Sequence, residues 1–221
     1  MNKTVFFFEL GHLFTNLGLL ILVFQIRSKR HIEGISFYTQ MLFAVATYAK
    51  MLYFPLTVLS DYWLCWAEFA ASLLLTTYLM YLMSTYKRIS FNKERNFYDY
   101  RAILLASAVL GFFSAYSKHE RFEWSQFSLR FSIICEAIGM LPQLRVMKLE
   151  KFVTRNLGYY LLCLALSRLC RIFFWVFQFV EHSGGSSYYT LILADLVYIV
   201  LIIDFIYNFL KHRNSSLIPY S

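Results

Sequence analysis

Hydrophobic residues dominate seven long stretches of the chain, and polar and charged residues gather in the short segments between them. Each stretch contains about the 20 mostly apolar residues that a helix needs to cross roughly 30 Å of hydrocarbon. The pattern predicts one all-α membrane domain over 1–221, with a short tail at 211–221. Its seven expected transmembrane helices lie at 4–26, 36–57, 61–86, 99–117, 124–147, 154–181 and 187–210.

The composition supports this interpretation, because 59% of the 221 residues are hydrophobic and only 15% are charged. An ordinary soluble domain carries about 25% charged residues. The sequence contains no Gly-rich phosphate loop, paired metal-binding motif or nucleophile elbow, so we expect neither an enzyme nor a cofactor or metal site. The cysteines show no disulfide or metal spacing and are expected to be small buried residues: Cys65, Cys135, Cys163 and Cys170.

The net charge of +8 is spread over alternate loops, so it indicates membrane topology and not a surface for nucleic acid. The side richer in Lys and Arg normally faces the cytosol. Only Lys3, Lys118 and Arg121 lie on the poorer side, which predicts a lumenal N-terminus and a cytosolic tail. The cytosolic set is Arg27, Lys29, Arg30, Lys87, Arg88, Lys93, Arg95, Arg145, Lys148, Lys151, Arg155, Lys211 and Arg213.

Seven spans divide naturally as three, one and three, an arrangement in which small transporters and their relatives are built from two repeats. The fifth stretch carries Pro142-Gln143 near its end. A proline inside a span usually kinks the helix, whereas a proline at a helix end is ordinary. The sequence leaves both alternatives open.

Ionisable residues inside the apolar stretches are the candidates for function. Each costs about 2.5–3.5 kcal/mol at the centre of a membrane helix, so such residues normally face a polar cavity or pair with one another. The set is Glu9, His12, Lys50, Glu68, Arg130, Glu136, Arg168, Arg171, Asp195 and Asp204.

The depths of four of these residues suggest a common cavity near the midplane. His12, Lys50, Glu136 and Arg168 all lie roughly 12–20 Å from the ends of their stretches, at 1.5 Å per residue. Histidine titrates near pH 6.5, so His12 beside Glu136 would link ligand affinity to pH. The alternative is that His12 only forms a hydrogen bond to a neighbour.

The cations in this set outnumber the acids. Lys50, Arg168 and Arg171 are matched by one nearby carboxylate, that of Glu136, with Glu9 as a further candidate. A cationic, partly desolvated pocket favours an anionic ligand such as a carboxylate. The alternative is that the arginines only pair with Glu136 or reach toward the interface. One helix face carries Arg168, Arg171, Trp175 and Gln178.

Five segments of the chain resemble, in order, the ER lumenal protein retention receptors, or KDEL receptors. They are "FFFELGHL", "GISFYTQMLFAVATYAKML", "FSIICEAIGMLPQL", "SRLCRIFFW" and "DFIYNFLK". The resemblance implies a seven-helix receptor of PQ-loop and SWEET-like plan. Such a receptor captures escaped ER proteins in the cis-Golgi by their C-terminal tetrapeptide. It releases them at the neutral pH of the ER and travels in COPI-coated vesicles.

The resemblance also implies roles for individual residues. His12 matches the pH-sensing histidine and Glu136 its acidic partner, and Arg168 and Trp175 match residues of the signal pocket. Lys50 stands where the family has the arginine that grips the terminal carboxylate. Two further residues concern transport: Asp204 matches a seventh-helix aspartate, and Lys211 is a candidate coat contact, although a basic residue after a last span is also ordinary topology.

Several positions depart from the family's pattern. Val5 and Gln178 replace arginines, Gln126 replaces a glutamate that pairs with the signal's lysine, and Ser167 and Arg171 replace tyrosines. We therefore expect a variant tetrapeptide that still ends in a free carboxylate and contains at least one acidic residue. Two other interpretations stay open: a small-solute transporter of the PQ-loop and SWEET kind, and a paralogue that has lost binding of the standard signal.

Overall fold

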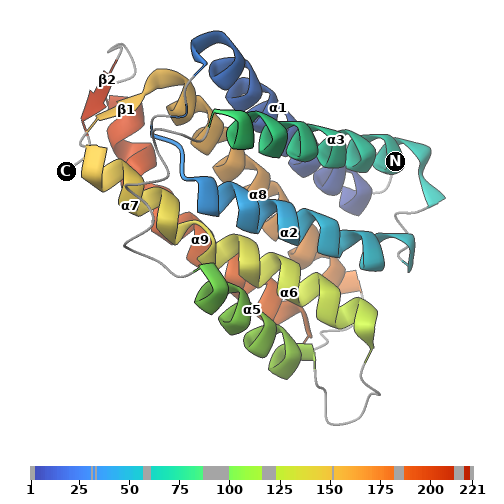
Figure 1. Ribbon diagram of the computed structural model, residues 1–221. Coiled ribbons are helices and arrows are strands. Elements are labelled where there is room, and N and C mark those ends of the chain that lie inside the picture. Colours follow the sequence, from blue (N-terminus) through green and yellow to red (C-terminus); the bar gives the residue numbers. More distant parts are fainter. Residues whose placement is uncertain are drawn as a thin grey trace.

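The computed structural model describes residues 3–30, 32, 34–56, 61–86, 100–115, 123–150, 152–181, 187–211 and 217–219. Helices occupy every stretch that the hydrophobic pattern predicts, and they run roughly along one common direction (Figure 1). Their bounds are α1 Lys3–Lys29, α2 Phe37–Tyr53 with the 3-10 turn Phe54–Leu56, α3 Trp63–Thr85, α5 Tyr100–Ala115, α6 Trp124–Ile138, α7 Leu141–Glu150, α8 Arg155–Glu181 and α9 Ser187–Lys211.

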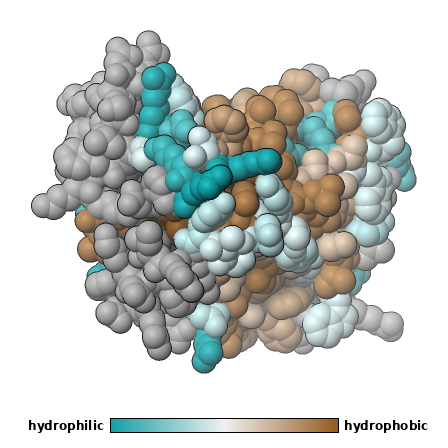
Figure 2. Space-filling model, turned by 45° about the horizontal axis from the view of Figure 1, so that its top comes forward, coloured by the Kyte–Doolittle hydropathy of each residue, from teal (hydrophilic) through white to brown (hydrophobic). Residues whose placement is uncertain are grey.

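The helices have the length and surface of a multi-pass membrane protein. Among the described residues, four helical segments are long and apolar enough to cross a bilayer: Thr4–Lys29, Trp63–Thr85, Trp124–Leu149 and Arg155–Glu181. Large hydrophobic side chains such as Leu74 and Phe113 point outward and are 72% and 71% exposed. Figure 2 shows a broad area of hydrophobic side chains on one face of the molecule. Lipid is the solvent that suits such a surface.

The packing of the helices brings distant segments of the chain together. Helix α1 packs against α3 and α8, α2 packs against α3 and α6, and α6 also packs against α5 and α9. Small residues permit close approach in membrane helices. A side chain at Gly111 of α5 would come within 3.1 Å of the backbone of Phe131 in α6, and one at Gly18 of α1 would come within 3.2 Å of the Tyr160 ring in α8.

The fifth stretch is a broken helix, and Pro142 stands just after the break. α6 ends at Ile138, and α7 begins at Leu141, so Pro142 is the second residue of α7. In the first turn of a helix, the N–H that proline lacks would have no intrahelical partner in any case. The proline therefore lies inside the long apolar segment and also at a helix start, so both sequence alternatives apply.

Gln143 attaches this break to the connection between α1 and α2. Its Oε1 accepts a hydrogen bond from the Ser36 N–H at 2.8 Å, and its Nε2 donates to the Gly34 carbonyl at 2.7 Å. Ser36 in turn caps α2, because its Oγ accepts from the Thr39 N–H at 3.1 Å. Gln143 is completely buried, so these bonds fix the connection from inside the protein.

The described part of the fold is all-helical, as predicted, apart from one short two-stranded sheet. Strand β1, Phe152–Thr154, pairs antiparallel with β2, Leu217–Pro219, so part of the predicted tail folds back onto the segment before α8. Each strand has only three residues, which is too few for alternation of polar and apolar residues to reveal it. The Gln25 amide of α1 donates to the Thr154 hydroxyl at 3.0 Å beside this sheet.

Two apolar clusters occupy opposite ends of the helix bundle. We call them the Gln143 end and the Trp175 end. The first includes Leu22 and Ile26 of α1, Met83 of α3 and Leu157 of α8. The second includes Val5, Phe54, Cys65, Phe69, Leu129, Ile133, Phe174, Trp175 and Leu191. All four cysteines of the chain are free, as the spacing predicts.

Candidate ligand-binding site

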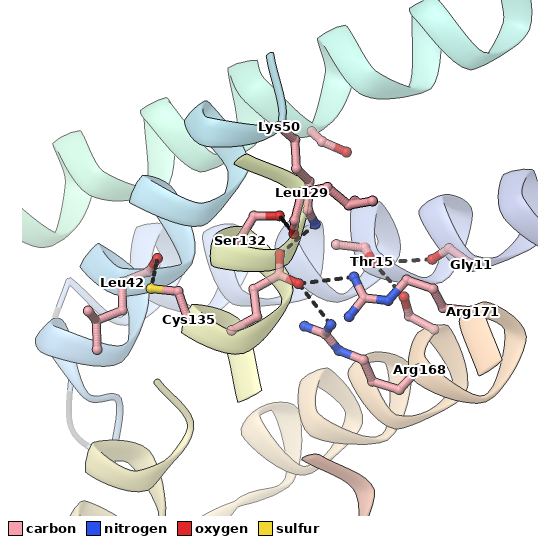
Figure 3. Close-up of polar contacts among 12 residues, drawn as sticks. Gly11, Thr15, Leu42, Lys50, Leu129, Ser132, Cys135, Arg168 and Arg171 are labelled. Carbon is pink, nitrogen blue, oxygen red and sulfur yellow. Dashed lines mark hydrogen bonds and ion pairs between the residues drawn. The ribbon is translucent and has the colours of Figure 1, made fainter. Parts of the chain in front are cut away.

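Three cations converge on one carboxylate between the two apolar clusters. The Lys50 ammonium of α2 donates to Glu136 Oε1 at 2.6 Å. Arg168 and Arg171 of α8 donate to Glu136 Oε2 through their Nη1 atoms at 2.8 and 3.0 Å. Figure 3 shows Lys50 reaching from α2 and both arginines from α8 toward the same point beside α6. The sequence-based expectation that these residues share a depth is consistent with this geometry.

A second carboxylate, Asp195 of α9, completes the network. Arg168 Nη1 donates to its Oδ1 at 3.2 Å, and Arg171 Nε donates to its Oδ2 at 2.9 Å. Arg171 Nη2 forms a further ion pair with Oδ1. Arg171 therefore grips Asp195 with two nitrogens of its planar fork, the geometry that makes arginine–carboxylate pairs strong.

Asp195 changes the charge balance that the sequence suggested. The sequence predicts Glu136 as the partner of the three cations, with Glu9 as a further candidate. In the structure, their ion-pair partners are Glu136 and Asp195. The network therefore carries a net charge of +1. Glu9 lies elsewhere, between α1 and α3, where it accepts a weak hydrogen bond from the Cys65 thiol at 3.8 Å. The expectation for Glu9 is corrected.

The three cations differ in how far they reach the surrounding space. The Arg168 side chain is only 6% exposed, and its guanidinium also lies 4.3 Å from the centre of the Tyr198 ring. The side chains of Lys50 and Arg171 are 18% and 16% exposed. Arg168 is therefore enclosed by the protein, whereas Lys50 and Arg171 are placed to meet a ligand.

The space that they reach is a cavity with two connected chambers. The inner chamber has a free volume of about 60 Å³, and both apolar and polar side chains line it. The polar residues beside the network include Thr15, Gln40, Thr47, Ser72, Thr76, Glu136, Ser167 and Arg168. The outer chamber has a free volume of about 50 Å³ and lies at the Trp175 end. Phe8, His12, Lys50, Phe69 and Arg171 line both chambers, so the two are continuous.

Two ring nitrogens beside the cavity have unused hydrogen-bonding capacity. His12 Nδ1 and Trp175 Nε1 are buried and have no hydrogen-bond partner among the described residues. The His12 ring packs on Phe8, with 4.5 Å between the ring centres. Buried polar atoms of native proteins are nearly always satisfied, so such atoms beside a cavity indicate a site for a ligand group.

Of the remaining candidates, Ser167 lines the inner chamber, and the others lie away from the chambers or outside the described side chains. Gln126 of α6 and Gln178 of α8 are partly buried and are not among the lining residues. Ser167 Oγ shares a hydrogen bond of 2.7 Å with Thr15 Oγ1. Asp204 and Lys211 belong to α9, but their side chains lie outside the part that the structure describes.

These features define a multi-pass helical membrane protein that encloses a charged cavity. A family model described as ER lumen protein retaining receptor matches residues 31–178, and the chain belongs to this family. It is 29% identical over 213 residues to the ER lumen protein-retaining receptor of Drosophila melanogaster, covering 95% of this chain and 94% of the relative. It is 26% identical over 216 residues to that of Saccharomyces cerevisiae, with coverage of 94% and 93%.

The similarity also extends to plants. The chain is 27% identical over 214 residues to ER lumen protein-retaining receptor A of Arabidopsis thaliana, covering 95% of this chain and 94% of the relative. The resemblance that the five segments suggest is thereby confirmed. It identifies the chain as a member of a receptor family whose name refers to retention of ER lumenal proteins.

Proposed function

We propose that this protein binds C-terminal, KDEL-like retention signals in the cis-Golgi and returns escaped ER proteins to the ER. Family membership supports the receptor class. The observation that carries the proposal is the net positive network at the floor of the cavity, where Lys50 and Arg171 are partly exposed. A peptide carboxylate supplies the negative charge that balances this network.

The proposed topology has seven spans in a PQ-loop and SWEET-like 3+1+3 arrangement, formed by one domain over 1–221 and surrounded by membrane lipids. The N-terminus is lumenal and the tail is cytosolic, as the distribution of Lys and Arg favours. The Trp175 end then faces the lumen, because it lies beside the beginning of α1. A retention signal would enter the outer chamber from that side.

Lys50 is the proposed contact for the terminal carboxylate. An ammonium group can donate three hydrogen bonds, and the structure describes one, to Glu136. Arg171 is held by Asp195 and adds positive charge beside Lys50, while Arg168 and Glu136 position both. Trp175 would contact the outer part of the signal, and Gln126 and Gln178 would meet the chain that precedes it.

His12 is the proposed pH switch, with Glu136 as its acidic partner. The charged groups around His12 are Lys50 from α2, Glu136 from α6 and Arg171 from α8, all of which line the inner chamber with it. Protonated His12 adds a charge that an anionic ligand stabilises. Ligand binding and protonation are then linked, so affinity rises as pH falls through the range in which histidine titrates.

Asp204 and Lys211 are the proposed elements of sorting. Asp204 would report the loaded state from α9, and Lys211, at the cytosolic end of α9, would contact the COPI coat. A receptor that captures its ligand in the cis-Golgi and returns it to the ER would be located in both compartments. Replacement of Lys211 by alanine is expected to slow Golgi-to-ER return without changing signal binding in detergent.

The experiment that tests the function is binding of purified receptor to a tetrapeptide with Asp-Glu-Leu at its end, as the free acid and as the amide. We expect the free acid to bind more tightly at roughly pH 5.5 than at pH 7.4. Equal binding of the amide would contradict the role of the carboxylate. Solute uptake into proteoliposomes, without peptide binding, would indicate a transporter instead.

A further inference from the structure

The outer chamber has an unusual combination of charge and wall chemistry. Its wall is formed mainly by hydrophobic side chains, including Phe54 of the 3-10 turn, Leu129 of α6 and Trp175 of α8. Its polar lining residues are Lys50, Arg171, His12 and Tyr53, and Trp175 adds its indole N–H. None of the described residues that line it is acidic. The acids of the network, Glu136 and Asp195, lie deeper and are already occupied by the three cations.

The aromatic wall is preorganised for a flat or apolar group. The Phe54 ring stacks on Phe69, with 4.8 Å between the centres and 19° between the planes. Phe174 meets Trp175 edge to face at 4.6 Å. These contacts hold the rings in place, so an apolar ligand group entering the chamber gains contact area without ordering the wall.

Trp175 also supplies a polar anchor. The residue is only 5% exposed, and its Nε1–H has no partner among the described residues. An extended peptide presents backbone carbonyl oxygens that can accept this hydrogen bond. Trp175 therefore offers an unpaired donor as well as an apolar ring.

The distance from the cationic floor to Trp175 matches the length of a short peptide. Trp175 lies seven residues after Arg168 on α8, which is about 10 Å along the helix axis. Three extended residues span about 10 Å. If the terminal carboxylate lies at the level of Lys50 and Arg168, the fourth residue from the end of the signal lies beside Trp175.

A basic residue at that position would meet an unfavourable environment. Its ammonium group would lie above Lys50 and Arg171, and no lining carboxylate is available to pair with it. The ammonium group would lose hydration in this mostly apolar chamber, and a contact with the Trp175 ring restores only part of that free energy. The chamber therefore disfavours lysine at this position and favours an apolar or aromatic side chain.

We infer that the retention signal recognised by this receptor carries an apolar or aromatic residue, not a basic one, at the fourth position from its free carboxyl end. This inference rests on the proposed function, because it concerns the same cavity and the same carboxylate. Tyr53 lines the outer chamber with an uncharged side chain, so an acidic residue at this position would introduce a partner for a basic residue of the signal.

The first test uses the unmodified receptor, so it does not depend on the stability of a variant. Dissociation constants are measured for four free-acid peptides, Phe-, Leu-, Lys- and His-Asp-Glu-Leu, at roughly pH 5.5. We expect the Phe and Leu peptides to bind at least about tenfold more tightly than the Lys peptide, from apolar burial. Tighter binding of the Lys peptide would overturn the inference while leaving the proposed function intact. Failure of all four peptides would overturn both.

The second test places a carboxylate in the wall. Tyr53→Asp should raise the relative affinity for the Lys peptide over the Phe peptide by about tenfold or more, because the new acid pairs with the ammonium group. Tyr53→Asn is the matched control, with nearly the same shape and no charge. If the ratio of the Lys-peptide affinity to the Phe-peptide affinity is the same in both variants, the placement of the fourth residue beside Tyr53 is contradicted. The ratio of two peptides on one variant is independent of how much of that variant folds.

Discussion

Gln143 and Trp175, at opposite ends of the helix bundle, differ in how their buried polar groups are paired. At the Gln143 end, the Gln143 amide both accepts from Ser36 and donates to Gly34, inside a cluster that includes the fully buried Leu22 and Ile26. At the Trp175 end, the indole N–H of Trp175 has no partner among the described residues, and Trp175 lines the outer chamber.

This difference indicates that the Gln143 end stabilises the fold and that the Trp175 end binds the ligand. Hydrogen bonds that close within the protein stabilise one arrangement of the chain, whereas a buried donor without a partner carries an energetic cost until a ligand supplies an acceptor. Substitutions at the Gln143 end should change stability more than affinity. Substitutions at the Trp175 end should change affinity more than stability, and the network between the ends should affect both.

The largest effect is expected from Glu136→Gln, which removes the acid that three cations share. Loss of one partner from a buried ion network costs about 3–5 kcal/mol. We expect a large fall in the thermal unfolding temperature of the detergent-solubilised receptor, together with loss of peptide binding. Glu136→Asp retains the charge and should be milder. Unchanged stability of Glu136→Gln would contradict the described network.

The next effect is expected from Gln143→Ala, at the opposite end. The buried Ser36 N–H loses its acceptor, at a cost of about 1–3 kcal/mol in unfolding free energy. Thermal unfolding should detect this loss, while the peptide affinity of the folded fraction should stay the same. Gln143→Glu retains an acceptor for Ser36 and serves as the matched variant. A large change in affinity would show that the two ends are coupled.

Lys50→Gln is expected to weaken binding of the free-acid peptide by roughly 10–100-fold, the effect of losing a charge-assisted hydrogen bond. Stability should fall less than in Glu136→Gln, because Glu136 keeps Arg168 and Arg171 as partners. Isothermal titration with the free acid and the amide measures the effect. Lys50→Arg preserves the charge and should preserve binding; equal loss in both variants would point to a steric cause instead.

The smallest effect is expected from His12→Gln, which should remove most of the difference in affinity between roughly pH 5.5 and 7.4. Affinity should be higher at the lower pH, because the protonated imidazole attracts an anionic ligand. Glutamine stays neutral at both pH values and removes this effect. His12→Lys, with a permanent charge, should bind with similar affinity at both values. If both variants still bind more tightly at the lower pH, another group must be the pH switch.

Much of the fold is predictable from the sequence because its helices are defined by long apolar stretches. The predicted helix at 154–181 differs by one residue from α8 at Arg155–Glu181, and the site residues Lys50, Glu136 and Arg168 could be grouped by depth alone. Depth along a helix follows from counting residues. It does not reveal which face of the helix meets which neighbour.

Because depth does not reveal the facing side of a helix, the sequence does not predict the pairing of Asp195 or the partners of Gln143. Asp195 is visible as an acid in an apolar stretch, and the cost of an unpaired Arg171 in a membrane signals that a second acid is needed. Nothing in the spacing shows that α9 turns Asp195 toward α8. The partners of Gln143, residues 34–36, are about 107 positions away in sequence, and only the packing of α7 against α2 brings them together.

The pairing of Arg171 with Asp195 has a consequence for how this chain can diverge. Among the described residues, Arg171 without Asp195 would keep only Glu136 as its ion-pair partner, and Asp195 without Arg171 would keep only Arg168. Loss of either residue therefore upsets the charge balance of the network, and that cost is lower when the other is lost as well. The residues at the two positions should therefore covary. Across close relatives of this chain they should be exchanged together, for instance for two apolar residues, and one without the other should be rare.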